Sequence, residues 1–173
     1  HQHEVILDYF GSSYMGCKIQ YVIEESPLGT GGAIKQALEQ VASENVFVFN
    51  GDTFFDVDIE SMFEQHNSCG PEVTLALKTL TEFERYGAVE VNDKFRITKF
   101  AEKQFCKEGL INGGVYLIKS NLFDGLDYPD QFSMEQDFFE KYSSEKQLEG
   151  FIDVGYFIDI GIPEDYERAQ EEL

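Results

Sequence analysis

The sequence is poor in basic residues, and it lacks a long apolar run. Its 13 Lys and Arg residues stand against 33 Asp and Glu residues, which gives a formal net charge of −20. This balance disfavours nucleic acid and anionic membrane surfaces as partners. No stretch approaches the roughly 20 apolar residues of a membrane-spanning helix, so we expect no membrane segment. A phosphorylated substrate remains compatible with the negative charge, because a bound divalent cation can invert the local field.

Cysteine and histidine are also scarce. The three cysteines, Cys17, Cys69 and Cys106, are widely spaced and form no CxxC pair. This pattern predicts neither a disulfide framework nor a zinc site and is typical of a reducing compartment, so we expect a cytoplasmic protein. No Ser/His/Asp or Cys/His arrangement suggests nucleophilic catalysis, and His66 is expected on the flank of a helix.

What the chain does contain is the composition and patterning of a globular α/β domain. It has 173 residues, 42% of them hydrophobic and 14% aromatic, enough for one domain over residues 1–173 with a sizeable core. The first 70 residues alternate helices and strands, as doubly wound folds with a parallel sheet do. The elements expected there are a helix over residues 4–10, a strand over 18–23, a loop over 27–32 leading into a helix with Ile34, Ala37, Leu38 and Val41 inward, a strand over 46–49, and a helix from the N-cap Asp58 to near Gly70.

The second half is predicted to consist mainly of strands. A hairpin is expected around Asn92-Asp93-Lys94, and a capping box at residues 133–136 predicts a helix through Tyr142. Pro163 is typical of the first turn of a further helix. The expected strands cover residues 73–77, 86–91, 96–100, 111–118, 147–152 and 156–160, and no repeat or linker interrupts the pattern.

Two carboxylates follow or interrupt apolar strands. Asp52 comes just after the apolar run of residues 46–49, where open α/β sheets bind ligands, although Asn-Gly-Asp is also a turn former. Asp159 lies within an otherwise apolar strand, and a buried carboxylate is costly unless it is paired, hydrogen-bonded or metal-bound. Together the two predict a Mg²⁺ site, because Mg²⁺ favours one or two carboxylates plus substrate phosphates. The alternative for Asp159 is a cap of the following helix.

Three further segments carry candidate binding groups. The glycine-rich stretch at residues 29–32 places free backbone N–H groups at a helix start, but it matches neither GxGxxG nor GxxxxGK[ST] and could be a plain turn. Lys103 could hold a phosphate as a mobile point charge, or Glu102-Lys103 could be a solvated surface pair. The amide of Asn112 offers a donor and an acceptor for sugar hydroxyls, although Asn112-Gly113-Gly114 is also typical of a bulge or turn.

Six motifs, taken together and in order, resemble the sugar-1-phosphate nucleotidyltransferases, also called NDP-sugar pyrophosphorylases, from about Tyr21 to the C-terminus. The Gly-Thr-Gly-Gly stretch and Ile-Asp-Ile-Gly-Ile-Pro-Glu-Asp-Tyr favour the bacterial D-glycero-D-manno-heptose 1-phosphate guanylyltransferases, with mannose-1-phosphate guanylyltransferases nearby. The motifs are Pro-Leu-Gly-Thr-Gly-Gly-Ala at 27–33, Asn-Gly-Asp at 50–52, Arg-Tyr-Gly at 85–87, Glu-Lys at 102–103, Ile-Asn-Gly-Gly-Val-Tyr at 111–116 and Phe-Ile-Asp-Ile-Gly at 157–161.

The resemblance implies a Rossmann-like doubly wound mixed sheet and a nucleotidyl transfer. A sugar 1-phosphate would attack the α-phosphorus of a nucleoside triphosphate, with GTP favoured, and release pyrophosphate in the presence of Mg²⁺. The implied roles are nucleotide binding for Gly29, Thr30 and Gly31, catalysis for Asp52 and Lys103, Mg²⁺ binding for Asp52 and Asp159, and sugar binding for Gly87, Glu102, Asn112 and Glu135. Two alternatives remain: a thymidylyl-, cytidylyl- or uridylyltransferase for a hexose 1-phosphate, and a non-catalytic module that senses sugar nucleotides.

One part of the family pattern has no counterpart in this sequence. The family opens with a strand, a glycine-rich loop ending in Gly-Thr-Arg, and a Pro-Lys segment that together cradle the triphosphate. We therefore expect an N-terminally truncated version of the fold, with an uncovered sheet position that leaves room for a homo-oligomer. The 173-residue polypeptide is expected to have little or no transferase activity by itself. A Gly-Thr-Arg loop encoded upstream of His1 would preserve the enzyme interpretation, and its absence would favour the sensing module.

Overall fold

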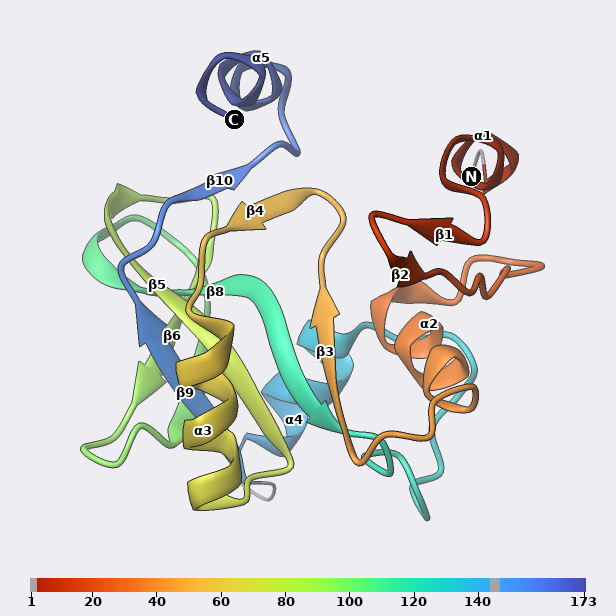
Figure 1. Cartoon of the computed structure of the whole chain (residues 1–173). Helices are drawn as coiled ribbons and strands as arrows, with labels where there is room; N and C mark the ends of the chain where they lie inside the picture. Colours follow the sequence, from red (N-terminus) through yellow and green to blue (C-terminus); the bar gives the residue numbers. More distant parts are fainter. Residues whose placement is uncertain (1–2, 144–146) are drawn as a thin grey trace.

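The computed structural model describes residues 3–143 and 147–173 and is built around a mixed six-stranded sheet (Figure 1). The strands run in the order β7-β6-β8-β5-β9, and β3 pairs with the carboxyl-terminal half of β8. Only β5 and β9 are parallel; the other pairs of this sheet are antiparallel. The strands are β3 (Asn45–Phe49), β5 (Val73–Phe83), β6 (Gly87–Val91), β7 (Ile97–Lys103), β8 (Cys106–Lys119) and β9 (Leu148–Asp153).

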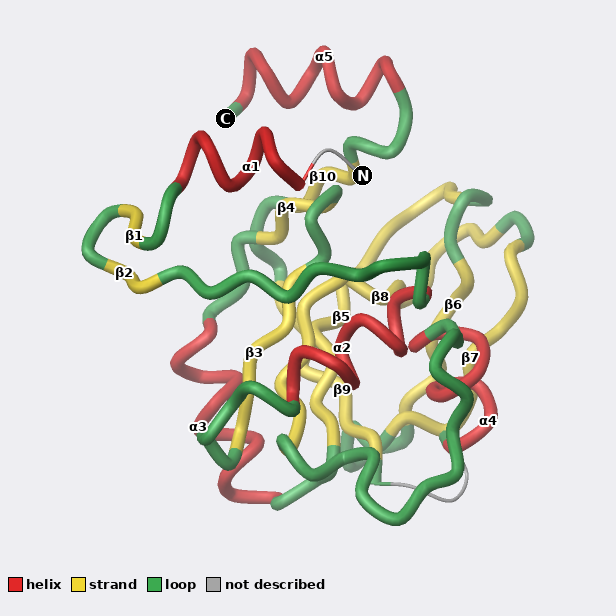
Figure 2. The backbone as a smooth tube through the Cα atoms, turned by 90° about the vertical axis from the view of Figure 1, so that its right-hand side faces the viewer, coloured by secondary structure: helices red, strands yellow, loops and turns green. Residues whose placement is uncertain are grey.

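Helices cover both faces of this sheet, with α3 on one face and α2, η1 and α4 on the other (Figure 2). A second, two-stranded sheet joins β4 to β10, and a short hairpin joins β1 to β2. The remaining elements are α1 (His3–Phe10), β1 (Ser13–Tyr14), β2 (Cys17–Lys18), α2 (Gly29–Leu38), β4 (Thr53–Phe55), α3 (Ile59–Cys69), the π-helix η1 (Met134–Phe139), α4 (Glu140–Tyr142), β10 (Phe157–Asp159) and α5 (Pro163–Glu172).

The central strands β5 and β8 are buried on both faces, and their side chains alternate between two cores. Leu75 and Ile118 face the core formed with η1, whereas Ala76 and Leu117 face the core formed with Met62 of α3. Successive residues of a strand point to opposite faces, so a strand covered on both sides needs a continuous apolar run. This agrees with the nearly continuous apolar runs of these strands, Val-Thr-Leu-Ala-Leu at 73–77 and Val-Tyr-Leu-Ile at 115–118.

The predicted mixed α/β fold is confirmed, and so are most of its elements. Asp58 caps α3 as expected, since its Oδ1 accepts a hydrogen bond of 3.0 Å from the Ser61 amide, and Gly70 ends this helix in the left-handed region. The strands predicted over residues 46–49, 73–77, 111–118 and 147–152 are all present, and some extend further than predicted.

Two expectations for the first 70 residues are wrong. The strand predicted over residues 18–23 is reduced to the two-residue β2, and Val22 and Ile23 are exposed. A strand needs a neighbouring edge for its backbone hydrogen bonds, and among the described residues only β1 offers one there. The parallel pairing predicted for the strand at residues 46–49 is also wrong. Within the described chain, β3 pairs only with β8, and this pairing is antiparallel.

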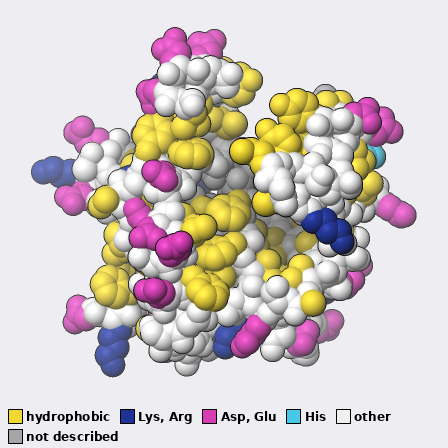
Figure 3. Space-filling view, viewed as in Figure 1, with side chains coloured by type: hydrophobic (Ala, Val, Ile, Leu, Met, Phe, Trp, Pro, Cys, Tyr) yellow, Lys and Arg dark blue, Asp and Glu magenta, His cyan; other side chains and the backbone are white. Residues whose placement is uncertain are grey.

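The second edge of β3 therefore has no strand partner in the described residues. It lies near a surface hollow with hydrophobic side chains on both walls, between the α5 side and the α1 side of the molecule (Figure 3). Exposed apolar side chains of β3, β4 and α1 include Phe49, Phe54 and Tyr9. β3 is therefore an edge strand of the sheet in the described part of the chain.

His66 is buried, which corrects its expected place on the flank of a helix. Its side chain is 1% exposed, with Nδ1 2.8 Å from Thr74 Oγ1 and Nε2 3.3 Å from Asn45 Oδ1. These contacts tie α3 to β5 and β3. Burial, together with the nearby charge of Lys119, lowers the pKa of His66 below its ordinary value.

This burial predicts a pH dependence of stability. Because folding lowers the pKa of His66, folding favours the neutral ring; its stabilising contribution is complete above the unfolded pKa of about 6.5 and is lost as the pH falls through the lower folded pKa. His66→Gln should therefore show a smaller loss of unfolding free energy between pH 7 and pH 5 than the wild type. Urea titrations at several pH values measure this, with the exposed His3→Gln as control. Equal pH slopes in the wild type and in His66→Gln would contradict it.

Candidate active site

Two adjoining cavities gather most of the residues that the sequence singles out. The first has a volume of about 280 Å³ and the second about 710 Å³, and they share Gly87, Lys103, Asn112 and Glu135. The first is completed by Asn50, Asp52, Thr53, Tyr86, Gly114, Phe157 and Asp159, and the second by Val89, Phe100, Ala101, Glu102, Ser133, Gln136 and Glu140. Gly29, Thr30 and Gly31 line neither cavity.

The small sheet formed by β4 and β10 brings Asp52 and Asp159 to the same cavity. Asp159 is directly opposite Thr53 in this antiparallel pair, and the Ile160 amide donates a 2.9 Å hydrogen bond to the carbonyl of Asp52. Asp52 is exposed, whereas Asp159 is half-buried. Asp52 and Asp159 thus line one cavity, although they are 107 positions apart in the sequence.

Asp159 is oriented by several donors rather than serving as a helix cap. Its Oδ1 accepts a 2.8 Å hydrogen bond from the Gly161 amide and its Oδ2 a 3.0 Å bond from the Tyr86 hydroxyl. The capping position of α5 is Ile162, so the alternative role of Asp159 as the cap of that helix is wrong. Burial, followed by the charge of Asp159, raises the pKa of Tyr86 to about 12, which keeps this phenol protonated as a donor at neutral pH.

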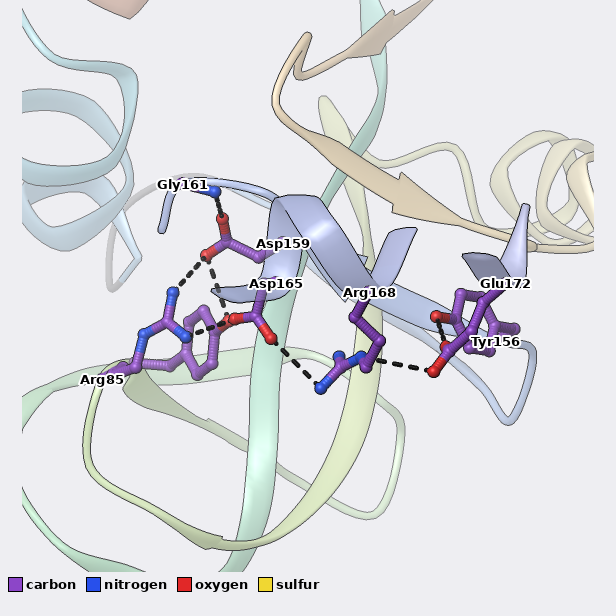
Figure 4. Close-up of polar contacts among 8 residues, drawn as sticks. Arg85, Tyr156, Asp159, Gly161, Asp165, Arg168 and Glu172 are labelled. Carbon is purple, nitrogen blue, oxygen red and sulfur yellow. Dashed lines mark hydrogen bonds and ion pairs between the residues drawn. The ribbon is translucent and has the colours of Figure 1, made fainter. Parts of the chain in front are cut away.

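Arg85 connects this carboxylate to the carboxyl-terminal helix (Figure 4). Its guanidinium lies 2.6 Å from Asp165 Oδ2 and 3.7 Å from Asp159 Oδ2. Asp165 also pairs with Arg168 at 3.1 Å, and Arg168 pairs with Glu172, whose carboxylate accepts a hydrogen bond from the Tyr156 hydroxyl. Helix α5 is thereby anchored beside Asp159.

Lys103 and Glu102 lie within a strand rather than after one. The strand predicted over residues 96–100 begins at Ile97 and continues to Lys103, where it pairs with Gly87 of β6. A Cβ atom on Gly87 would lie 2.5 Å from the carbonyl oxygen of Ala101, so glycine permits this close strand contact. The pairing holds the backbone of Gly87 beside the lysine in both cavities.

Asn112 lies in the middle of β8 rather than at its start. Its Oδ1 accepts a 3.0 Å hydrogen bond from the Gly114 amide, and its Nδ2 donates to the Tyr116 hydroxyl at 2.9 Å. Gly114 has a φ of +75°, and the register between β5 and β8 shifts between Leu75 and Leu77. The strand irregularity considered for this motif is therefore present, and it places the amide in the cavity wall.

The glycines at residues 29–32 form the first turn of α2, not a loop before it. The backbone amides of Gly31 and Gly32 donate to the carbonyl of Phe132 at 3.0 and 3.4 Å. The expectation that these two N–H groups are free is therefore wrong. A Cβ atom on Gly31 would lie 2.2 Å from the Phe132 ring, which explains why glycine stands there. The turn is joined to the cavities through the Thr30 hydroxyl, which donates to Glu135 Oε2 at 2.8 Å.

Tyr116 is a site residue that the sequence did not reveal. Its side chain is 1% exposed, and its hydroxyl donates to Glu135 Oε1 at 3.1 Å while accepting from Asn112. Burial, followed by the charge of Glu135, raises the pKa of this phenol. A tyrosine inside an apolar strand needs a partner for its hydroxyl, and this need was the available signal.

The donor set on the cavity wall suits a hard divalent cation. No group of three or more His, Cys, Asp or Glu side chains with metal-binding geometry occurs in residues 3–143 and 147–173. Mg²⁺ usually binds one or two carboxylates and takes its remaining ligands from water and substrate phosphates. Asp52 and Asp159, which line one cavity together with Lys103, fit that requirement.

Comparison with known proteins agrees with this geometry. Residues 1–173 match the sequence family described as nucleotidyl transferase. The chain is 51% identical over 173 residues to the D-glycero-alpha-D-manno-heptose 1-phosphate guanylyltransferase of Aneurinibacillus thermoaerophilus, covering 100% of this chain and 75% of that protein. It is 44% identical over 166 residues to the protein of the same name from Campylobacter jejuni, covering 96% and 72%.

A solved structure shares the fold. The crystal structure of HddC from Yersinia pseudotuberculosis complexed with GMP-PN superimposes with a TM-score of 0.85 at 33% identity, covering 99% of this chain and 74% of that one. In the part of the chain that the structure describes, no helix is both long and apolar enough to cross a membrane. The resemblance to the sugar-1-phosphate nucleotidyltransferases is confirmed, and the chain belongs to the nucleotidyl transferase family.

Proposed function

We propose that the protein to which this chain belongs transfers GMP from GTP to a sugar 1-phosphate of the heptose type, giving a GDP-sugar and pyrophosphate. The observation that carries the proposal is the cavity in which Lys103, Asn112 and Glu135 meet the carboxylates of Asp52 and Asp159. The guanine base and the heptose are supported by the names of the relatives at 51% and 44% identity. The free thiols of all three cysteines support a cytoplasmic location.

The larger cavity would bind the sugar. Its volume of about 710 Å³ suits a small phosphorylated sugar, and its wall carries Glu102, Asn112 and Glu135 as partners for hydroxyl groups. Lys103 belongs to both cavities and would hold the sugar phosphate as a point charge. The first turn of α2, at Gly29, Thr30 and Gly31, would lie against the nucleobase.

The reaction requires little covalent chemistry from the protein. An oxygen of the sugar phosphate attacks the α-phosphorus of GTP, a new P–O bond forms, the bond to the β-phosphate breaks, and pyrophosphate leaves. Holding the two phosphates in line is the main contribution of the site. Asp52 and Asp159 would hold Mg²⁺, which when bound neutralises charge on the phosphates. Tyr86 and Gly161 fix the orientation of Asp159 for this purpose.

A pyrophosphate-release assay on the full protein tests the proposal, with Mg²⁺, GTP and D-glycero-α-D-manno-heptose 1-phosphate. Asp52→Asn and Asp159→Asn should each lower kcat by about 100-fold or more, because each removes a carboxylate that would hold the Mg²⁺ ion, which neutralises charge on the reacting phosphates. Lys103→Met should raise KM for the sugar phosphate most. Asp93→Asn, in the exposed hairpin between β6 and β7, is the matched control and should leave the rate unchanged.

Comparing GTP with dTTP, CTP and UTP in the same assay distinguishes the guanylyltransferase from the alternative transferases. Ligand binding without turnover would favour the sensing module. Turnover with none of the four triphosphates, or Asp52→Asn and Asp159→Asn at the wild-type rate, would contradict the proposed function.

A further inference from the structure

The first turn of α2 is clasped onto the segment that opens η1. The Thr30 hydroxyl donates to Glu135 Oε2 at 2.8 Å and accepts a hydrogen bond from the Met134 amide at 2.9 Å. The backbone bonds from Gly31 to Phe132 and from Phe132 to Leu28, both 3.0 Å, lie beside this contact. Segments about 100 residues apart in the sequence are thus held by one side-chain hydroxyl and a backbone ladder.

The other oxygen of Glu135 continues the connection into the sugar cavity. Oε1 accepts a hydrogen bond from the buried Tyr116 hydroxyl at 3.1 Å, and this hydroxyl accepts one from Asn112 at 2.9 Å. Asn112 and Glu135 both line the 710 Å³ cavity. One unbroken chain of hydrogen bonds therefore runs Thr30–Glu135–Tyr116–Asn112, from the turn at α2 to the cavity wall.

We propose that Thr30 is a positioning residue that couples the nucleotide subsite to the sugar subsite through Glu135. The inference rests on the proposed function, in which the turn at Thr30 lies against the nucleobase. A nucleotide that orders this turn holds the Glu135 carboxylate, and through Tyr116 the Asn112 amide, in the orientation that receives the sugar. Binding of either substrate then strengthens binding of the other by the same factor, since coupling between two sites is reciprocal.

The chemistry of the links makes the coupling dependent on one hydroxyl. Glu135 as a carboxylate only accepts, and Thr30, Ser133 and Tyr116 all donate to it. Ser133 is the N-cap of η1 and Tyr116 belongs to β8, so Thr30 is the donor that comes from the α2 turn. Hydrogen bonds to a charged group are stronger than neutral ones, which allows a single hydroxyl to carry a measurable share of the coupling.

Calorimetry on the full protein tests this. The affinity for mannose 1-phosphate and for D-glycero-α-D-manno-heptose 1-phosphate is measured with and without saturating guanosine 5′-(α,β-methylene)triphosphate, whose α–β bridge resists transfer. In the wild type the nucleotide analogue should tighten sugar-phosphate binding by about 5-fold or more, within the usual range of site-to-site coupling. Thr30→Val, which keeps the shape of the side chain and removes the hydroxyl, should bring this factor close to one.

Three comparisons separate positioning from a general structural effect. Thr30→Ser retains the hydroxyl and should restore the coupling. Thr98→Val removes a hydroxyl that donates to the Glu90 carbonyl outside both cavities, and it should leave the coupling unchanged. At saturating GTP, Thr30→Val should raise KM for the sugar phosphate with kcat close to the wild-type value.

Equal coupling in Thr30→Val and the wild type overturns the inference, as does a wild type that turns over substrate without any coupling. In both cases the proposed function still stands, because turnover is retained. A wild type that binds neither ligand and shows no turnover removes the proposed function and the inference together.

Discussion

The close approach of other chain segments to the two glycines of β8 is the constraint on which the site depends. A Cβ atom on Gly113 would lie 2.4 Å from the Phe55 ring, and one on Gly114 would lie 2.6 Å from Thr53 Oγ1. The backbone N–H of Asn50 donates to the Gly114 carbonyl at 2.8 Å. Without side chains at these two positions, β4 and the turn that carries Asp52 can lie against the sheet. The pairing of β4 with β10 then brings the second carboxylate, Asp159, into the same cavity.

Strand β8 also supplies Asn112, which lines both cavities. Beyond the irregularity at Gly114, β8 continues into the core, where Tyr116 is directed toward η1. The π-helical geometry of η1 is uncommon and occurs frequently at functional sites, and here Glu135 lies in its first turn. The two carboxylates therefore come from the turn before β4 and from β10, the Lys103 cation comes from β7, and the polar network comes from β8 and η1. Rigid strands hold most of these groups, which suits a reaction that depends on positioning.

Local patterns in the sequence predicted much of this arrangement. The apolar run before Asp52, the cap at Asp58 and the family motifs identified the elements and most residues that line the cavities. Features that depend on distant partners were missed. The alternation at residues 18–23 resembles a strand, but the edge it would need is not offered by the described chain. The burial of His66 showed no local sign, because its partners come from two strands that are distant in the sequence. The apolar run around Tyr116 indicated burial, but the partner of its hydroxyl, Glu135, comes from η1. Lys103 extends a strand whose length is set by its pairing with Gly87.

The central claim is that the carboxylates of Asp52 and Asp159 and the sugar-phosphate position beside Lys103 form one site. Phosphorus NMR tests it most directly, with Mn²⁺ as a paramagnetic substitute for Mg²⁺, since both ions favour carboxylate oxygens. With guanosine 5′-(α,β-methylene)triphosphate present, Mn²⁺ bound to the full protein should strongly enhance the relaxation of the mannose 1-phosphate signal. Asp159→Asn should abolish this enhancement. No enhancement in the wild type, or an equal one in Asp159→Asn, would contradict the account.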